Sequence, residues 1–236
     1  MTLPPTVHIS SHPCLQAKLS QLRSQSTTPR ETRALVQEIT SILGVEAFAS
    51  GLALKKTGTD RTPLGIEYET QGIDPADLAL VPILRSGLGM VDSLNDLLPT
   101  PVPIYHLGLF REKATLTPVE YYNNLPFHRE QLSPASPASL DMKTNTAAAT
   151  LAVLLDPIIA TGGTAEAAIH LLREWGVQKV IMLSVLGSES GVKRAVDAWD
   201  QVEVWVGAVD RECNDSGMIV PGVGDIGDRL FVAIGK

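Results

Sequence analysis

One acidic residue, Asp156, directly follows a run of apolar residues in the middle of the chain. The run, 151–155, has the length and composition of a central parallel strand that is covered on both faces. Asp156 is therefore expected at the carboxyl end of a strand, where open α/β sheets bind their ligands. A carboxylate in that position can accept hydrogen bonds from the hydroxyl groups of a ligand.

The residues after Asp156 form a small loop of glycines and hydroxyl side chains that leads into a helix predicted over 165–175. Its two glycines allow positive φ angles and close approach of the backbone to a ligand, while Thr161 and Thr164 supply hydroxyl donors. An anion would meet oriented N–H groups and the positive end of a helix dipole. The alternative is an ordinary tight turn in which Thr164 is the N-cap. A Walker A loop is excluded, because no Gly-Lys-Ser/Thr follows.

A second apolar run, 78–84, predicts another buried strand and places Arg85 at its end. A guanidinium fork matches phosphate oxygens, and Gly87 and Gly89 expose the backbone nearby. A dinucleotide-binding fingerprint is only weakly matched, because Asp92 stands where its third glycine would be. The alternative for Arg85 is a surface arginine beside a turn.

Two further segments have the composition of ligand-binding loops. Residues 110–126 lack apolar periodicity, carry Arg111 and lie between strand signals, which is typical of a lid; the alternative is a mobile surface loop. Residues 219–229 are dense in glycine, so their main chain could contact a ligand closely. The alternative for them is a turn-rich connection in which Asp228 and Arg229 form a local ion pair.

Length, charge and cysteine content predict one globular domain, 1–236, in the cytoplasm. The chain has no secretory signal pattern and no apolar run long enough for a membrane span. Its two cysteines, Cys14 and Cys213, are too few for a disulfide framework. The net charge of −7 argues against a nucleic-acid surface. An acidic protein that binds a polyphosphate must therefore provide positive potential locally.

Alternating strand and helix signals predict an α/β fold with a doubly wound, mostly parallel sheet. A capping box with proline at the first helical position starts a helix at about residue 29, and the glycine-rich segment 56–77 predicts a β-hairpin arm. Residues 127–148, which are poor in apolar side chains, are predicted to be a disordered insertion without chemistry. The remaining expected elements are helices over 90–98 and 191–199 and strands over 104–107, 180–185 and 202–209.

Four motifs in one order, DPIIATGGT, VPILRSGLGM, GLFREKATLTPVEYYNNLP and IVPGVGDIGDRLF, resemble those of the uracil phosphoribosyltransferases, members of the type I phosphoribosyltransferase group. The similarity covers nearly the whole chain except its first residues and about 127–148. It implies the type I fold with a small hood and a hairpin arm at a dimer contact. It also implies transfer of phosphoribosyl from 5-phospho-α-D-ribose 1-diphosphate to N1 of uracil, which gives UMP and diphosphate.

The resemblance also implies roles for individual residues. Asp156, Arg111 and Asp225 are the implied catalytic residues, and backbone groups of Ile219, Gly224 and Ile226, next to Asp225, are implied to bind uracil. The implied contacts to phosphoribosyl diphosphate are made by Arg85, Arg111, Asp156, Pro157, Ile158, Ile159, Ala160, Thr161, Gly162, Gly163, Thr164 and Asp225.

Two residues depart from the pattern of the family. Pro157 replaces a second acidic residue found in many type I relatives, so we expect Mg²⁺ to be held mainly by substrate and water. Met218 stands where many relatives have an aromatic residue, which leaves the lining of the base pocket open. The resemblance further suggests a homodimer or homotetramer and admits GTP as an activator, with neither nucleic acid nor membrane as a partner.

Two other functions stay open at the level of sequence. A type I enzyme for a purine or for orotate would need a different base pocket in place of IVPGVGDIG. A non-catalytic regulator that senses nucleotides and binds RNA would need a basic face, which the acidic composition disfavours.

Overall fold

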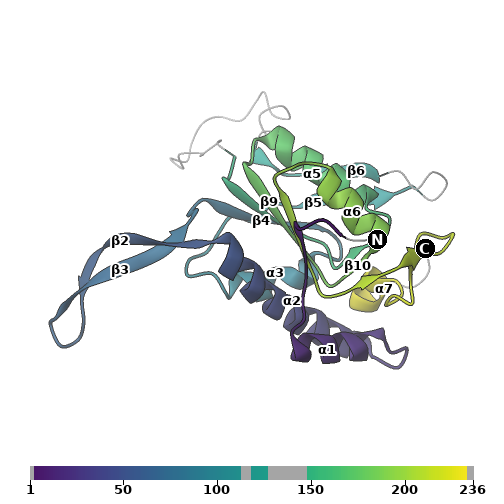
Figure 1. The fold of residues 1–236 in the computed structure, drawn as a ribbon, viewed down its shortest axis with the longest axis horizontal. Helices are drawn as coiled ribbons and strands as arrows, with labels where there is room; N and C mark the ends of the chain where they lie inside the picture. The colour runs from purple at the N-terminus through teal and green to yellow at the C-terminus, as the bar shows by residue number, and fades with distance from the viewer. Residues whose placement is uncertain (1–2, 113–117, 127–147, 233–236) are drawn as a thin grey trace.

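A seven-stranded sheet with helices on both faces forms the body of the protein in the computed structural model, which describes residues 3–112, 118–126 and 148–232 (Figure 1). The strand order is β1-β11-β9-β7-β4-β5-β6. All neighbouring pairs are parallel except β5 and β6 at one edge. Smaller sheets are formed by β12-β10-β8, by β13-β14 and by β2-β3.

The elements of the main sheet and the helices have the following bounds. The strands are β1 (Val7–Ile9), β4 (Leu78–Leu84), β5 (Leu107–Arg111), β6 (Pro118–Asn123), β7 (Leu151–Leu155), β9 (Lys179–Ser184) and β11 (Val202–Val206). The helices are α1 (Pro13–Arg23), α2 (Pro29–Gly51), α3 (Leu88–Asn95), α5 (Gly163–Trp175), α6 (Glu189–Asp197) and α7 (Ile226–Phe231). The strands of the smaller sheets are β2 (Ala53–Arg61), β3 (Glu67–Asp74), β8 (Ile158–Ile159), β10 (Leu186–Ser188), β12 (Val209–Asp210), β13 (Glu212–Cys213) and β14 (Ile219–Val220).

Strands β4 and β7 lie at the centre of the sheet and have the predicted bounds. Every residue of β7 is buried, as is every residue of β4 before Leu84. Their side chains alternate between two hydrophobic cores, one against α1, α2, α3 and α7 and the other against α5 and α6. Continuous burial explains why these strands are apolar throughout. The predicted doubly wound α/β fold is confirmed.

Helix α2 begins at the predicted capping box. The Thr28 hydroxyl accepts a hydrogen bond from the Glu31 N–H, and the Glu31 carboxylate accepts one from the Thr28 N–H at 2.8 Å. The hydrogen bonds from the Thr28 N–H and hydroxyl lower the pKa of the Glu31 carboxyl. The cap is therefore strongest above the ordinary carboxyl pKa and is lost as the pH falls through the lowered value.

The predicted arm is a long antiparallel hairpin of β2 and β3 that projects from the body of the molecule (Figure 1). Its register runs from Ala53 opposite Asp74 to Arg61 opposite Glu67. Every residue of β2 is exposed, and so are the large apolar side chains of Leu64 and Ile66 at the turn. The rest of this chain therefore leaves β2 uncovered and touches β3 only near its end, where Ile73 packs against the core.

Three predictions of secondary structure are wrong. The strand expected over 104–107 is instead β5, which starts at Leu107, while Ile104 forms an isolated bridge with Leu80. The predicted loop at 110–126 contains the end of β5 and all of β6, which pair antiparallel. The expected strand over 202–209 is divided between two sheets, because β11 pairs with β9 only as far as Val206, while Val209 pairs with Gly187 of β10.

Other elements differ from prediction only at their ends. Helix α3 covers 88–95 instead of 90–98, α5 starts at 163 instead of 165, and α6 covers 189–197 instead of 191–199. The predicted insertion falls almost entirely on 127–147, which lie outside the described residues. β13, β14 and α7 form the small hood at the carboxyl end of the chain (Figure 1). No helix in the described part of the chain has the length and apolar composition needed to cross a membrane.

Candidate active site

A cavity of about 510 Å³ opens at the carboxyl ends of β4 and β7. Both strands lie at the centre of the parallel sheet, which is where ligands of open α/β folds bind. Most of the residues predicted from sequence line this cavity: Arg85, Asp156, Ile158, Ile159, Ala160, Thr161, Gly162, Thr164, Ile219, Gly224, Asp225 and Ile226. Segments far apart in sequence therefore converge on one site.

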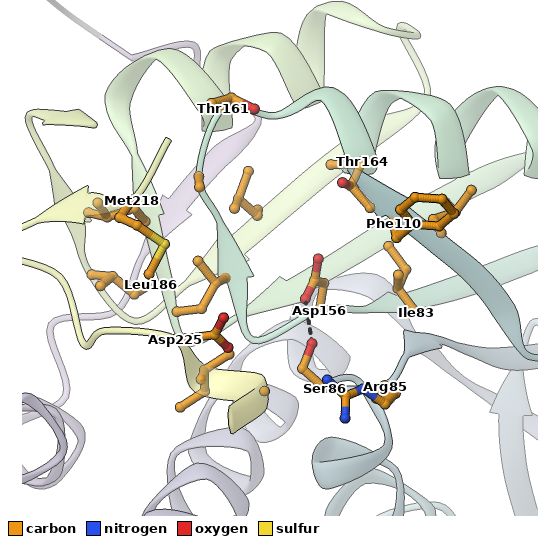
Figure 2. Close-up of a pocket in the computed structure, with 18 of the residues that line it drawn as sticks. Ile83, Arg85, Ser86, Phe110, Asp156, Thr161, Thr164, Leu186, Met218 and Asp225 are labelled. Carbon is orange, nitrogen blue, oxygen red and sulfur yellow. Dashed lines mark hydrogen bonds between the residues drawn. The ribbon is translucent and has the colours of Figure 1, made fainter. Parts of the chain in front are cut away.

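Asp156 and Arg85 reach the cavity because β4 and β7 pair in parallel with Pro82 opposite Leu155. Asp156 is buried, and the Ser86 hydroxyl donates a hydrogen bond to its Oδ1 at 3.3 Å (Figure 2). A buried carboxylate requires polar partners, and Ser86 is one of them. Arg85 is more open: 43% of its side chain is exposed, and its Nη2 lies 4.0 Å from Asp228 Oδ1. The guanidinium is thus accessible to an anionic ligand.

The loop between Asp156 and α5 has the geometry expected of an anion site. Gly162 is the N-cap of α5 and has φ of 78°, a left-handed conformation that favours glycine. The helix begins at Gly163, so its first N–H groups have no intrahelical partners. Thr161 and Thr164 lie at the two ends of this turn (Figure 2). Backbone donors, hydroxyls and the helix dipole together can bind a phosphate group.

Two residues of this loop do not line the cavity and contact the protein instead. The Pro157 carbonyl accepts hydrogen bonds at 3.0 Å from the N–H groups of Val185 and Leu186, which join the loop to β10. Gly163 lies against Arg194 of α6, whose Nη1 would be 3.3 Å from a Cβ at this position. Arg194 is itself paired with Glu166. These contacts connect the loop to β10 and α6.

The carboxyl-terminal segment forms the opposite wall of the cavity. The Asp225 carboxylate caps α7 by accepting a hydrogen bond from the Asp228 N–H at 3.0 Å, so one of its oxygens already has a structural role. The predicted alternative of an Asp228–Arg229 pair is wrong. Asp228 faces Arg85, whereas Arg229 donates hydrogen bonds to the backbone carbonyls of Leu22, Val223 and Ser24. Burial lowers the pKa of the Arg229 guanidinium.

Sequence reasoning missed part of the cavity wall. Phe110 and Tyr121, whose ring centroids are 6.0 Å apart, contribute an aromatic side from the β5–β6 pair. Leu186, also missed, lines the apolar side next to Asp225 together with Met218, which the sequence analysis had singled out for the base pocket (Figure 2). Phe110 and Tyr121 both fall within the predicted lid, 110–126, and aromatic residues in such a segment are the signal that could have identified them.

Arg111 is the last residue of β5, and its backbone is paired with Pro118. Its side chain lies outside what the structure describes, so its predicted contact with a diphosphate stays a prediction. Within the described residues no group of three or more His, Cys, Asp and Glu side chains could hold a metal ion.

These features suit a ligand that carries anionic groups, hydroxyls and a flat polar ring. The loop before α5 and Arg85 offer donors to anions, Asp156 offers an acceptor to hydroxyls, and the glycine-rich segment after Ile219 exposes its backbone. Because the cavity has an apolar wall between these groups, a ring can be held there while its polar edge meets main chain. The site can therefore place two reacting groups side by side.

The family model for uracil phosphoribosyltransferase matches residues 9–233. The chain is 41% identical to the uracil phosphoribosyltransferase of Roseiflexus castenholzii over 95% of its own length and 97% of that protein. It is 40% identical to the putative uracil phosphoribosyltransferase urg2 of Schizosaccharomyces pombe, over 96% and 90% of the two chains. Among solved structures, the AQ2163 protein from Aquifex aeolicus is similar, with a TM-score of 0.82, 30% identity and coverage of 96% and 98%.

The anion loop has little room for a side chain at Gly162, and a pair of substitutions tests this. Gly65, at the tip of the arm, has the same φ of 78° but nothing within 4 Å of an added Cβ, whereas a Cβ at Gly162 would lie 2.5 Å from the Gly191 carbonyl oxygen. Gly65→Ala should cost about 1–2 kcal/mol of unfolding free energy from the backbone conformation alone. Gly162→Ala should cost about 1 kcal/mol or more beyond that, because backbone atoms must move. Equal losses in urea denaturation would show that the loop relaxes freely.

Proposed function

The chain belongs to the uracil phosphoribosyltransferase family, and we propose that it transfers phosphoribosyl from 5-phospho-α-D-ribose 1-diphosphate to N1 of uracil, giving UMP and diphosphate. The observation that carries this proposal is the cavity in which the buried Asp156, the loop before α5 and the backbone after Ile219 face one another. Such a transferase needs all three: an acceptor for ribose hydroxyls, donors for phosphate and a pocket for the base. The reaction would salvage free uracil for nucleotide synthesis.

The proposed chemistry is a substitution at the ribose carbon C1′. The bond from uracil N1 to C1′ forms, the bond from C1′ to the diphosphate oxygen breaks, and the N1 proton is released. Positive charge develops on the ribose ring as the leaving group departs. Asp156 holds the ribose hydroxyls and stabilises this charge, because its buried carboxylate is already oriented by Ser86. The loop from Ala160 to Thr164 holds the 5′-phosphate, while Arg85 and Arg111 hold the diphosphate.

The proposed base site is built from main chain. Uracil presents one N–H flanked by two carbonyl groups, which backbone C=O and N–H groups of Ile219, Gly224 and Ile226 can complement. Ile226 is the first residue of α7, so its N–H has no partner within the helix. Asp225 lies between the base and the phosphoribosyl group in this arrangement. Met218 and Leu186 cover the apolar face of the ring.

Mg²⁺ is the proposed cofactor and would arrive bound to the diphosphate. This ion keeps several waters and is commonly held by one or two carboxylates together with substrate phosphates. The buried carboxylate of Asp156 is a suitable oxygen ligand, and Pro157 offers no second one. When bound, the ion would neutralise the charge of the leaving group.

We also propose that the arm pairs two copies of the chain into a homodimer, or a homotetramer built from such dimers. The support is the exposure of the arm's large side chains, which include Leu54 at 76%, Leu64 at 85% and Ile66 at 63%. Surfaces of this kind commonly mark association sites. GTP as an activator and a cytoplasmic location complete the proposal, and adding GTP to the assay below tests the former.

The base assignment is tested by mixing the protein, Mg²⁺ and phosphoribosyl diphosphate with one nucleobase at a time. Uracil should yield UMP, whereas cytosine should react at least ~10²-fold less efficiently, because its N3 and 4-amino groups leave buried backbone groups unpaired. Monophosphate formation followed by chromatography gives kcat/KM for each base. Turnover of cytosine at a similar rate, or a preference for hypoxanthine, would refute the assignment.

Asp156→Asn tests the proposed role of the carboxylate. The change is isosteric and the Ser86 hydroxyl can still donate to an amide oxygen, so unfolding free energy should change by about 1 kcal/mol or less. kcat/KM should fall about 10²-fold or more, because a preorganised charge beside the ribose ring is lost. Asp77→Asn is the matched control: Asp77 accepts hydrogen bonds from Thr150 just before β7, at the other end of the strand. A full-activity Asp156→Asn variant would contradict the proposed role.

A further inference from the structure

The three-stranded sheet β12-β10-β8 lies between the two loops to which we assign the substrates. β8, at Ile158–Ile159, belongs to the loop before α5, while β12 leads into the carboxyl-terminal segment that carries the base site. The central strand β10 pairs with both, in parallel: Gly187 lies opposite Ile159 on one side, and Ser188 lies opposite Asp210 on the other. Neither Ser188 nor Asp210 lines the cavity.

Ser188 joins β10 to the loop before α5, which is the proposed phosphate loop. Its side chain is fully buried, and its hydroxyl donates a hydrogen bond to the Ala160 carbonyl at 2.5 Å. The same oxygen accepts a hydrogen bond from the Gly191 N–H at 2.9 Å and so caps α6. One buried hydroxyl therefore joins the loop, β10 and the start of α6, and no water is needed to satisfy these groups.

Asp210, together with Arg23 of α1, joins β12 to the carboxyl-terminal segment that carries the proposed base site. Arg23 forms a two-pronged ion pair with Asp210, at 2.8 Å from Nη1 to Oδ2 and 2.7 Å from Nη2 to Oδ1. The Gly222 carbonyl accepts from Arg23 Nη1 at 2.9 Å, and the Gly222 N–H donates to Asp210 Oδ2 at 3.0 Å. The N–H and the carbonyl of Gly222 are thus both held by one ion pair.

Gly222, which the ion pair holds, lies within the proposed base segment. Gly222 has φ of 63°, and a Cβ there would lie 2.2 Å from the Ile219 carbonyl oxygen, so this turn can be made only by glycine. Ile219 and Gly224, on either side, line the cavity. The ion pair is largely buried, with 26% of the Arg23 and 10% of the Asp210 side chain exposed. Solvent therefore screens it little.

We propose that Arg23, Asp210 and Ser188 are positioning residues that tie the base loop and the phosphate loop to one small sheet and so set the separation of uracil N1 and C1′. This inference rests on the proposed function. Reacting atoms must be held about 3–3.5 Å apart, and a displacement of about 1 Å can cost ~10²-fold in rate. The two loops lie more than 50 residues apart in the chain, and β10 is the element that pairs with a strand from each side.

Substitution of the ion pair tests the base side. Asp210→Asn keeps the volume of the side chain but loses the charge, and Arg23→Lys keeps the charge but loses the two-pronged geometry. Each should raise KM for uracil about tenfold or more, with a loss in kcat, because the base is misplaced. The Kd of phosphoribosyl diphosphate, measured by calorimetry without uracil, should stay within about twofold, since the phosphate loop is unchanged.

Ser188→Ala tests the phosphate side and should give the opposite pattern. The Kd of phosphoribosyl diphosphate should rise about fivefold or more, because the Ala160 carbonyl loses its buried donor. Lys18→Ala is the control for all three variants: Lys18 is also on α1 and pairs with Glu38 at 2.5 Å, away from the cavity. Its KM, kcat and Kd should equal those of the unmodified chain.

Comparing the change in the KM for uracil with the change in the Kd of phosphoribosyl diphosphate distinguishes a positioning role from a general effect on stability. All assays are run below the melting temperature of each variant, so a general loss of fold is excluded. The proposal would be overturned if the Arg23→Lys and Asp210→Asn variants melt earlier but keep the uracil KM of the unmodified chain. It would also be overturned if every variant loses affinity for uracil and for phosphoribosyl diphosphate to the same extent. If the unmodified chain uses another base, the proposed function fails first, and the same ratios are then measured with that base.

Discussion

The parallel pairing of β4 with β7 is the constraint on which the rest of the structure depends. Five residue pairs, from Leu78–Leu151 to Pro82–Leu155, align the two strands so that both end at the same edge of the sheet. Arg85 and Asp156 are brought together by this register alone, although they are 71 residues apart in the sequence. Because parallel strands are covered on both faces, helices must lie on both sides, and the strand ends are the place left open for a ligand.

Polar contacts at that edge of the sheet hold the loops in a defined conformation and so give the site its shape. Only short parts of these loops, β8 and β14, pair as strands, so their other backbone groups need other partners if they are to be held without water. Side chains supply them: Ser188 for Ala160, Arg23 and Asp210 for Gly222, and Arg229 for the carbonyls of Leu22 and Val223. A buried ion pair adds little net stability, but it penalises any arrangement in which one partner is left alone. That penalty favours a single loop conformation.

The use of arginine side chains in structural contacts also determines how much positive charge this acidic chain has at the cavity. Arg23, Arg194 and Arg229 are engaged in structural contacts, and of the described residues only Arg85 brings a positive side chain to the cavity wall. Helix α5 adds the positive end of its dipole through residues that have no charge. A ligand with several negative charges would need more than these two sources. Arg111 and a bound cation are the natural additions in the proposed reaction.

Local patterns were sufficient wherever one segment carries its own signal. The apolar runs at 78–84 and 151–155, the capping box at Thr28 and the turn at 162–164 could be predicted because burial, capping and positive φ are properties of neighbouring residues. The composition of the loops likewise indicated phosphate binding. By itself, the sequence thus determined the class of fold, the strand ends that carry Arg85 and Asp156, and the family.

Tertiary structure decided what depends on distant partners. The β5–β6 pair has no clear signal of its own, because its strands are defined by hydrogen bonds to each other and to β4. The split after Val206 arises because Val206 still pairs with Ser184 of β9, whereas Val209 pairs with Gly187 of β10, more than 20 residues away in the chain. The joining of Arg23 to Asp210 and Gly222 is likewise invisible in the sequence, where an arginine, an aspartate and a glycine are ordinary residues. Only folding brings their charges and backbone groups within hydrogen-bond distance, and this is why the chemistry could be read locally while the geometry could not.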